Sequence, residues 1–346
     1  MLRPGAQRSL HAVAGIIDET NQSMTDDNSR ETDERTMNYG KKHVNVYRTY
    51  ATPLTGLREI PESEFTGKPN TLLGMEVRAQ VEGEEFLPSF RDGDNSKVVA
   101  TDSMKNFILH HAGDYDGATV EGFLHYVGSE FLDTYDQMEA VRMSADELQF
   151  DERPVPDGEG GFEPSDVVFR VSDNESAFGE YYLKREDGDV VIENQRSGVT
   201  DIELVKVKDN SFVGYVQDEY TTLPERENRT LYIGLDIFWT YDDPETALGN
   251  DPEEYVPAEQ VRDIAQVVFH EQDVNSIQDL VYQIGLRVLE RFPQLAEVNF
   301  ESRNQTWLGV RKDDLEGDAK VLREPPRPTG FQRFSMDHSD LEGEAE

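Results

Sequence analysis

The seven histidines are the side chains best suited to metal binding or to proton transfer near neutral pH, and their spacing argues against a metal site. No two stand four residues apart on a predicted helix and no HExxH motif occurs, although that spacing places two imidazoles on one helical face. The chain has no cysteine, which excludes thiolate metal sites, disulfides and cysteine nucleophiles. We therefore predict an activity that uses no bound metal. The histidines are His11, His43, His110, His111, His125, His270 and His338.

Strand-like alternation appears first at residues 39–50. Side chains alternate between the two faces of a strand, so Lys41, His43 and Asn45 are expected to share one face. A strand is also predicted at 72–82 and another at about 137–148, and a strongly periodic helix lies between them.

Two amphipathic helices carry apolar residues at helical spacing, one at 119–134 and one from Ile277 onwards. Residues 119–141 align with 276–298 without a gap, and the alignment places Gly128 on Gly285. The shared glycine and the shared exit into a strand indicate a tandem duplication. Each half is then predicted to be an antiparallel sheet with two helices on one face, an α+β arrangement. Other predicted strands are 166–171, 178–184, 200–208, 229–241 and 296–301, and a further helix is predicted at 258–270.

The charge balance is strongly acidic, with 71 Asp and Glu against 33 Lys and Arg and a net charge of -38. The acidic residues are spread between periodic segments, which favours an acidic folded surface over a disordered acidic block. Molar salt shortens the Debye length to roughly 3 Å and relieves the repulsion within such a surface. We therefore predict a cytoplasmic protein of an organism that lives in high salt. The same charge argues against nucleic acid and anionic membranes as partners.

The ends of the chain differ in character from its middle. Residues 10–17 form an apolar run too short for a signal sequence, and residues 18–36 are polar and acidic. Residues 1–36 are predicted to be disordered or wrongly included, since Met24 and Met37 are alternative starts to Met1. The C-terminal residues are acidic and lack a peroxisomal SKL signal. The predicted organisation is an N-terminal segment at 1–36, a first domain at 37–160, a second domain at 161–325 and an acidic tail at 326–346.

Five segments resemble, in order, the motifs of the urate oxidase (uricase) family. VVATDSMKN at 98–106 resembles its Thr-Asp motif, and YGKKHV at 39–44 resembles its N-terminal strand. Residues 197–229 resemble its longest signature, with a Phe, DEYTTL and an Arg. NSIQDLVYQIG at 275–285 resembles its Ser-Val-Gln segment, and SRNQTW at 302–307 resembles its Asn-x-His segment imperfectly.

The resemblance implies the tunnelling fold (T-fold), with two tandem copies per chain. Each copy is a four-stranded antiparallel sheet backed by two helices, which agrees with the duplication. Family members form homotetramers whose sheets close into a barrel, with active sites between subunits. Lys41, Thr101 and Asp102 would then face second-half residues of a neighbouring chain.

The resemblance also implies a set of substrate-binding residues for urate, a flat purine anion. Arg229 would make a bidentate, charge-assisted contact with one edge of the ring. Gln278 would offer a donor and an acceptor at the adjacent edge, and Phe212 would stack on the ring. Ile277 and Asp102 would each contribute a main-chain group. Taken singly, each residue has an ordinary structural interpretation, and only their joint occurrence in family order favours the functional one.

The implied reaction is the cofactor-independent oxidation of urate by O2 and water to 5-hydroxyisourate and hydrogen peroxide. Lys41 and Thr101 would form a proton relay, and Asn304 would hold oxygen or water above the ring. The sequence departs from the family pattern at Thr306, which occupies the position of a histidine in that relay. His43 is then a candidate substitute, because it is expected to lie on the same strand face as Lys41.

Two alternatives remain open at the level of sequence. A related T-fold enzyme acting on a pterin would generally use metal-binding residues or a distinctive glutamate, and the metal-binding set is missing here. A non-catalytic purine- or pterin-binding T-fold protein is favoured only by the departure at Thr306.

Overall fold

The computed structural model describes residues 37–172, 175–273, 275–305, 307–310, 321–323 and 329–342. The chain divides into two units, Met1–Thr36 and Met37–Glu346. The first unit lies outside the described residues, as do the predictions made for 1–36. None of the helices in the described ranges combines the length and apolar character needed to cross a membrane.

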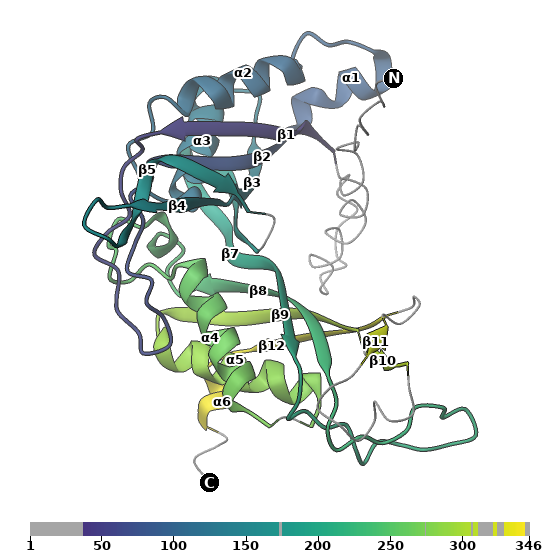
Figure 1. Ribbon diagram of the computed structural model, residues 1–346. Helices are drawn as coiled ribbons and strands as arrows, with labels where there is room; N and C mark the ends of the chain where they lie inside the picture. The colour runs from purple at the N-terminus through teal and green to yellow at the C-terminus, as the bar shows by residue number, and fades with distance from the viewer. Residues whose placement is uncertain are drawn as a thin grey trace, which may run out of the picture. The chain divides into compact units, whose positions relative to one another are not determined.

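One antiparallel sheet of eight strands forms the centre of the second unit (Figure 1). Its strand order is β1-β2-β3-β6-β7-β8-β9-β12. The order falls into two equal runs that are joined where β6 pairs with β7. The strands are β1 Asn38–Thr49, β2 Leu72–Glu82, β3 Ala140–Leu148, β6 Ser176–Glu186, β7 Asp189–Lys206, β8 Leu231–Tyr241, β9 Leu295–Gln305 and β12 Gly330–Met336.

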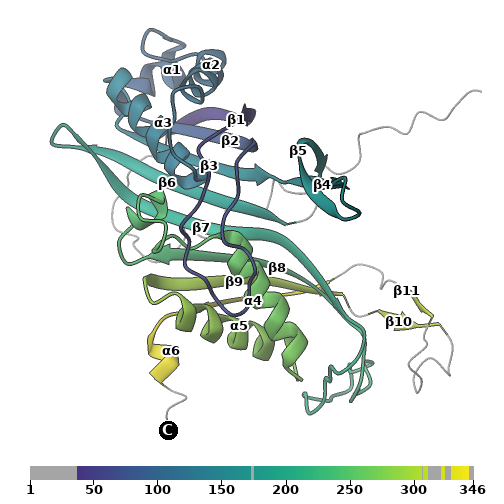
Figure 2. The same ribbon diagram turned by 60° about the vertical axis from the view of Figure 1, so that its left-hand side comes forward.

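Four helices pack against this sheet and share one hydrophobic core with it. Two of them contact strands of the first run and two contact strands of the second run (Figure 2). The predicted α+β class with tandem halves is therefore confirmed. The helices are α2 Thr101–His111, α3 Val120–Thr134, α4 Ala258–Glu271 and α5 Ile277–Arg291.

Helices α3 and α5 show the repeat most directly. Each has 15 residues and begins after a hydroxyl residue, Thr119 or Ser276, whose side chain accepts a main-chain N–H bond in the first turn. Gly128 and Gly285 occupy equivalent places where the helix approaches the sheet, and an added Cβ would clash with a side chain of β6 or of β12. The glycine is thus kept in both halves because it allows the helix and sheet to pack closely.

The first strand of each half also carries an equivalent bulge. β1 shifts its register against β2 after Lys41, and β7 shifts against β8 after Val199. In each bulge two residues oppose one residue of the partner strand, and the second of the two, His43 or Asp201, has a φ of 59°. An extra residue reverses the face to which the following side chains point. The bulge therefore decides which side chains of β1 lie on the helix-covered face.

Two segments differ from their prediction. Residues 166–171 belong to β5 Phe162–Val171, which pairs only with β4 Phe150–Pro156 in a separate hairpin. The predicted acidic tail at 326–346 contains β12, an edge strand of the main sheet. Most side chains of β12 are exposed, so its sequence shows little of the hydrophobic alternation that predicts a strand. The remaining short elements are η1 Glu84–Phe86, α1 Leu87–Asp92, η2 Thr246–Leu248, β10 Leu308–Gly309, β11 Leu322–Arg323 and α6 Ser339–Glu342.

The connection from β1 to β2, residues 50–71, leaves its own half and runs across the helices of the other (Figure 2). We call it the strap. Its Glu62 side chain, only 4% exposed, accepts bonds from Arg287 at 2.9 Å and Arg291 at 2.8 Å, both on α5. The buried Gln260 amide of α4 donates to two strap carbonyls at 2.8 and 2.9 Å. Largely buried ion pairs and hydrogen bonds thus fix the strap to α4 and α5.

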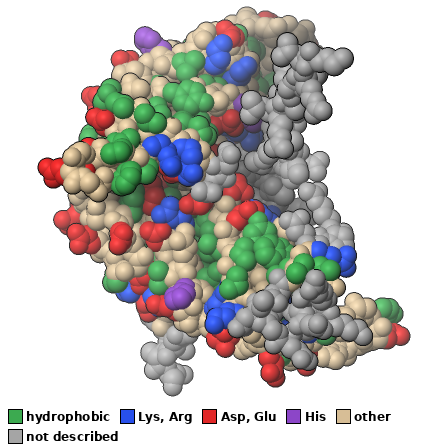
Figure 3. Space-filling model, viewed as in Figure 1, with side chains coloured by type: hydrophobic (Ala, Val, Ile, Leu, Met, Phe, Trp, Pro, Cys, Tyr) green, Lys and Arg blue, Asp and Glu red, His purple; other side chains and the backbone are tan. Residues whose placement is uncertain are grey.

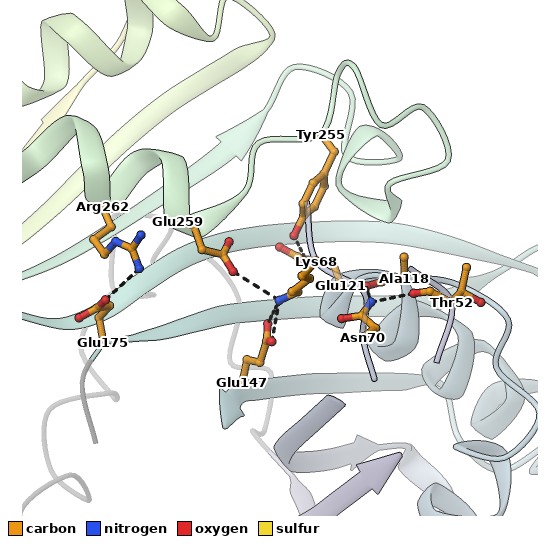
Figure 4. A network of polar contacts seen from close by, with 10 residues as sticks. All are labelled: Thr52, Lys68, Asn70, Ala118, Glu121, Glu147, Glu175, Tyr255, Glu259 and Arg262. Carbon is orange, nitrogen blue, oxygen red and sulfur yellow. Dashed lines mark hydrogen bonds and ion pairs between the residues drawn. The ribbon is translucent and has the colours of Figure 1, made fainter. Parts of the chain in front are cut away.

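Lys68, at the end of the strap, lies between carboxylates of both halves (Figure 4). Its Nζ is 2.6 Å from Glu147 on β3 and 3.4 Å from Glu259 on α4. Burial alone would lower the pKa of Lys68, but the two carboxylates outweigh it and the pKa is raised. A charged lysine therefore links β3 to α4.

Glu121 makes a second buried link between the halves. This α3 side chain accepts hydrogen bonds from the Ser197 hydroxyl of β7 at 2.7 Å and from the Tyr255 hydroxyl at 3.0 Å. Burial raises the pKa of Glu121 to about 7, although both hydrogen bonds act in the opposite direction.

This burial makes the stability of the fold depend on pH. The folded-state pKa of Glu121 lies above its unfolded value of 4.5, so its contribution to stability is largest below pH 4.5 and is lost as pH rises through 7. The full difference amounts to roughly 3 kcal/mol. Glu121→Gln cannot titrate, so the free energy of unfolding of wild type minus that of the variant should fall between pH 5 and pH 8.

Denaturant unfolding in molar salt at several pH values measures this difference. Altered packing in the variant would add a constant to this difference at every pH. Such a constant does not affect the test, because only the change of the difference with pH is compared. A difference that stays flat from pH 5 to pH 8 would contradict the raised pKa.

Candidate active site

Lys41 lies on the helix-covered face of the sheet, close to the start of α2. It pairs with the buried Ala79 of β2. The pKa of the Asp102 carboxyl is lowered, chiefly by a hydrogen bond from Lys105 and in smaller part by the charge of Lys41. The structure thus brings Lys41 near the first turn of α2.

Thr101 and Asp102 are the first two residues of α2, and no side chain caps this end of the helix. The first N–H groups of a helix have no partner within the helix, and they favour negative charge. The Asp102 side chain turns back along the helix, toward Lys105 at 2.6 Å and Asn106 at 3.2 Å. The main chain at this end is therefore suited to hold an anion or a carbonyl oxygen. We call Lys41, Thr101 and Asp102 the first group.

The expectation that His43 shares a strand face with Lys41 is wrong. Lys41 lies opposite Ala79, and the bulge that follows turns His43 to the other face. There the His43 Nδ1 atom is 2.8 Å from the carboxylate of Glu76, which pairs with Asn45. Period-two alternation fails here because two residues of β1 oppose one of β2. Within one chain, His43 lacks the placement on which its role as a substitute depended.

Arg229 is a cation in a largely apolar position, just before β8. Only 8% of it is exposed, and burial lowers the pKa of its guanidinium. Its Nε donates to the Asn210 side chain at 2.8 Å, and its guanidinium carbon lies 5.0 Å from the centre of the Phe212 ring. Arg229 therefore faces an aromatic ring and a neutral amide, with no carboxylate among these contacts.

Phe212 is fixed by both its main chain and its ring. Its N–H donates to the Arg226 carbonyl at 2.8 Å and its carbonyl accepts from the Arg226 N–H at 3.1 Å. The ring stacks on Tyr215, with centres 4.7 Å apart and planes 14° apart. Phe212 thus belongs to an aromatic pair, which fixes the position of its ring.

The start of α5 is tied to the same segment. The Ser211 hydroxyl donates to the Asn275 side chain at 2.6 Å, immediately before the helix cap at Ser276. Ile277 is buried and Gln278 is exposed in the first turn. We call Phe212, Arg229, Ile277 and Gln278 the second group, and the structure holds these residues on one connected set of segments.

Asn304 lies near the end of β9, between Ile233 of β8 and Gly330 of β12. A Cβ atom added at Gly330 would be 2.6 Å from the Asn304 side-chain oxygen. The amide of Asn304 therefore occupies space that only glycine leaves free. Thr306 lies outside the described residues, while Trp307 beyond it stacks on Tyr232 with ring centres 5.7 Å apart.

The first and second groups are far apart within one chain. β1 and β8 are five positions apart in the sheet, or about 24 Å at ~4.8 Å per strand. Asn304 on β9 is one position further away from β1. The two groups of predicted site residues therefore lie at different places along the sheet of one chain.

Sequence reasoning missed three residues that shape the second group, namely Asn210, Ser211 and Tyr215. Each acts through a contact within or next to the matched signature, and none stands at a position for which a role was expected. No group of three or more histidine or acidic side chains in the described ranges is arranged to hold a metal ion. The independence from metals stays a prediction.

Comparison with known proteins gives consistent matches. A family profile described as Uricase matches residues 37–179 and 195–333. A uricase of Halalkalicoccus jeotgali is 73% identical over 88% of this chain and 99% of the relative, and a uricase of Haloferax volcanii is likewise 73% identical over 88% and 99%. Among solved structures, a uricase from Bacillus fastidious has a TM-score of 0.86 at 51% identity, covering 90% of this chain and 97% of that one.

Proposed function

This chain belongs to the uricase family, and on that premise we propose that it is a urate oxidase. The reaction consumes urate, O2 and water and yields 5-hydroxyisourate and hydrogen peroxide. The observation that supports it best is the second group. There the buried Arg229 guanidinium lies over Phe212 and is tied, through Asn210 and Ser211, to Asn275 just before α5.

The second group fits the chemistry of the urate anion. Arg229 supplies a planar cation whose donors match carbonyl oxygens along one edge of the ring. The exposed Gln278 supplies a donor and an acceptor for the adjacent edge, and the main chain at Ile277 completes that side. Phe212, backed by Tyr215, supplies an aromatic face.

The first group supplies the proton transfer. Urate itself provides the electrons that reduce oxygen, so the protein has to bind the anion, remove a proton and hold oxygen over the ring. Lys41 and the Thr101 hydroxyl form the relay, while the main-chain N–H of Asp102 holds the purine. Asn304 positions oxygen and then the water that adds to the oxidised ring. In this proposal Lys41 and Thr101 carry the relay without the family histidine.

One site needs two chains. The first and second groups lie about 24 Å apart along one sheet, which exceeds the reach of a single purine. β1 and β12 are the edge strands of the sheet, and Phe331 on β12 is 77% exposed. We infer a homotetramer in which the first group of one chain meets the second group of its neighbour.

We further propose that the protein works in the cytoplasm at high salt. Acidic side chains are scattered over the visible face of the molecule rather than gathered in one block (Figure 3). The net charge of -38 would strain a compact fold at low salt, and molar salt screens this repulsion. The 73% identical relatives come from Halalkalicoccus and Haloferax, which agrees with this setting.

The first test is turnover. The purified protein in molar salt should remove urate, followed by its ultraviolet absorbance, and should form hydrogen peroxide in equal amount. Exhaustive treatment with EDTA should leave the rate unchanged. Loss of activity that a transition metal restores would refute the cofactor-free mechanism. Tight urate binding with no turnover would favour the non-catalytic purine-binding alternative.

The second test separates binding from proton transfer. Loss of a charged hydrogen bond costs roughly 1.5–3 kcal/mol, or about 10- to 150-fold in affinity, so Arg229→Ala should weaken urate and unreactive purine analogues alike. Lys41→Met should keep analogue binding and lower turnover by about 10²–10⁴-fold. His43→Ala should leave turnover nearly unchanged, since His43 faces Glu76. If calorimetry shows that Lys41→Met loses analogue binding as severely as Arg229→Ala, the relay is wrong.

The third test concerns sites shared between chains. Thr101→Ala damages the first group and Arg229→Ala damages the second, so each protein alone should be nearly inactive. Co-refolding equal amounts should restore activity at about a quarter of the sites if the chains mix at random. Mixed assemblies, proven by two different tags, that show no recovery would place the whole site within one chain.

A further inference from the structure

Asn210 makes the closest polar contact of Arg229, and the reaction described above gives it no role. None of its surface is exposed. Its side-chain oxygen accepts from Arg229 Nε at 2.8 Å, and its main-chain carbonyl accepts from the Arg229 N–H, also at 2.8 Å. One residue therefore fixes both the backbone and the side chain of Arg229.

These bonds determine which edge of the guanidinium is free. A guanidinium is planar and presents its donors in a fixed fork, with Nε on one edge and the two Nη groups at the end. With Nε bonded to Asn210, a side-on contact through Nε is no longer open to a ligand. The Phe212 ring, 5.0 Å from the guanidinium carbon, restrains the tilt of the plane. Two Nη groups then point in one direction as a pair.

The Asn210 amide is also notable because it carries no charge. The chain has 71 acidic residues, and Asp209 stands next to Asn210 in sequence. A carboxylate in place of the Asn210 amide could accept the same hydrogen bond, but it would neutralise the Arg229 charge at short range. An amide accepts the bond and leaves that charge available to an anionic ligand.

The segment that carries Asn210 is anchored on both sides. The Asp209 N–H donates to the Asn228 side chain at 3.0 Å, and the Ser211 hydroxyl donates to Asn275 at 2.6 Å. The Thr230 hydroxyl donates to the Val207 carbonyl at 3.1 Å. Arg229 is therefore ordered before any ligand arrives, which lowers the entropy cost of binding.

We propose that Asn210 is a positioning residue for the urate site. It presents the paired Nη groups of Arg229 to the purine edge, and as a neutral acceptor it keeps the guanidinium charge uncompensated. The proposal rests on urate as the ligand of this site. It assigns the site a preference for anionic over neutral purines that depends on Asn210 being an amide.

Xanthine is a suitable probe, because it lacks the third carbonyl of urate and changes from neutral to anionic within an accessible pH range. Its Kd would be measured by calorimetry in molar salt at one pH below and one pH above its first proton loss. The variants are Asn210→Ala, which removes the acceptor, and Asn210→Asp, which keeps the acceptor but adds charge. Asn250→Asp adds the same charge at an exposed turn and serves as the matched control.

Asn210→Ala should weaken both forms of xanthine by about 10-fold, because the guanidinium loses its orientation. Asn210→Asp should bind neutral xanthine nearly as wild type does and weaken the anion by about 10-fold or more. Asn250→Asp should change neither. Equal binding by wild type and both Asn210 variants, or an Asn210→Asp loss that is the same for both forms, would overturn the proposal.

A double-mutant cycle keeps the proposal testable if Asn210→Asp fails to fold. Arg229→Lys removes Nε, so Asn210→Ala should have little further effect on xanthine affinity in that background. Additive losses would show that Asn210 acts through general stability. Wild-type protein that binds xanthine but does not oxidise urate would refute the proposed activity alone, whereas active wild type with unaffected Asn210 variants would refute the positioning role alone.

Discussion

Main-chain pairing between β6 and β7 joins two four-stranded half sheets into one, and the layout of the functional residues follows from that join. With the halves side by side, β1 stands at one edge of the sheet and β9 lies one strand from the other. Lys41 and the start of α2 then belong to one end, and Arg229 and Asn304 to the other. No local movement of a side chain can close a gap of about five strand positions. A chemistry that needs both ends needs a second chain.

Buried polar groups help to hold the two halves of the sheet in a fixed arrangement. The strap reaches from the first half to α5, where the nearly buried Glu62 meets two arginines. Lys68 and Glu121 add two further links between halves (Figure 4). Buried ion pairs contribute little net stability over apolar packing, but breaking one leaves a costly unpaired charge. Such links therefore favour one arrangement of the halves over others.

Charge is distributed differently at the surface and at the second group. Acidic side chains are scattered over the visible face of the molecule, where salt would screen their mutual repulsion (Figure 3). Around Arg229 the contacts are an aromatic ring and an amide, although carboxylates are abundant elsewhere in the chain. A buried cation without a carboxylate beside it is a poor contributor to stability and a good receptor for an anion. This placement agrees with the proposed role of Arg229 in binding an anion.

Local periodicity in the sequence was enough to predict most strands, three of the four long helices of the core, and the duplication that relates α3 to α5. The family motifs were enough to identify the candidate residues, because those residues stand at fixed places within short segments. Neither source could show that His43 faces away from Lys41, since one extra residue in a bulge reverses alternation and leaves no mark on composition. Nor could they show that β12 completes the sheet or that Asn210 holds Arg229. These features arise from pairing between segments distant in sequence, where register and packing decide which side chains meet.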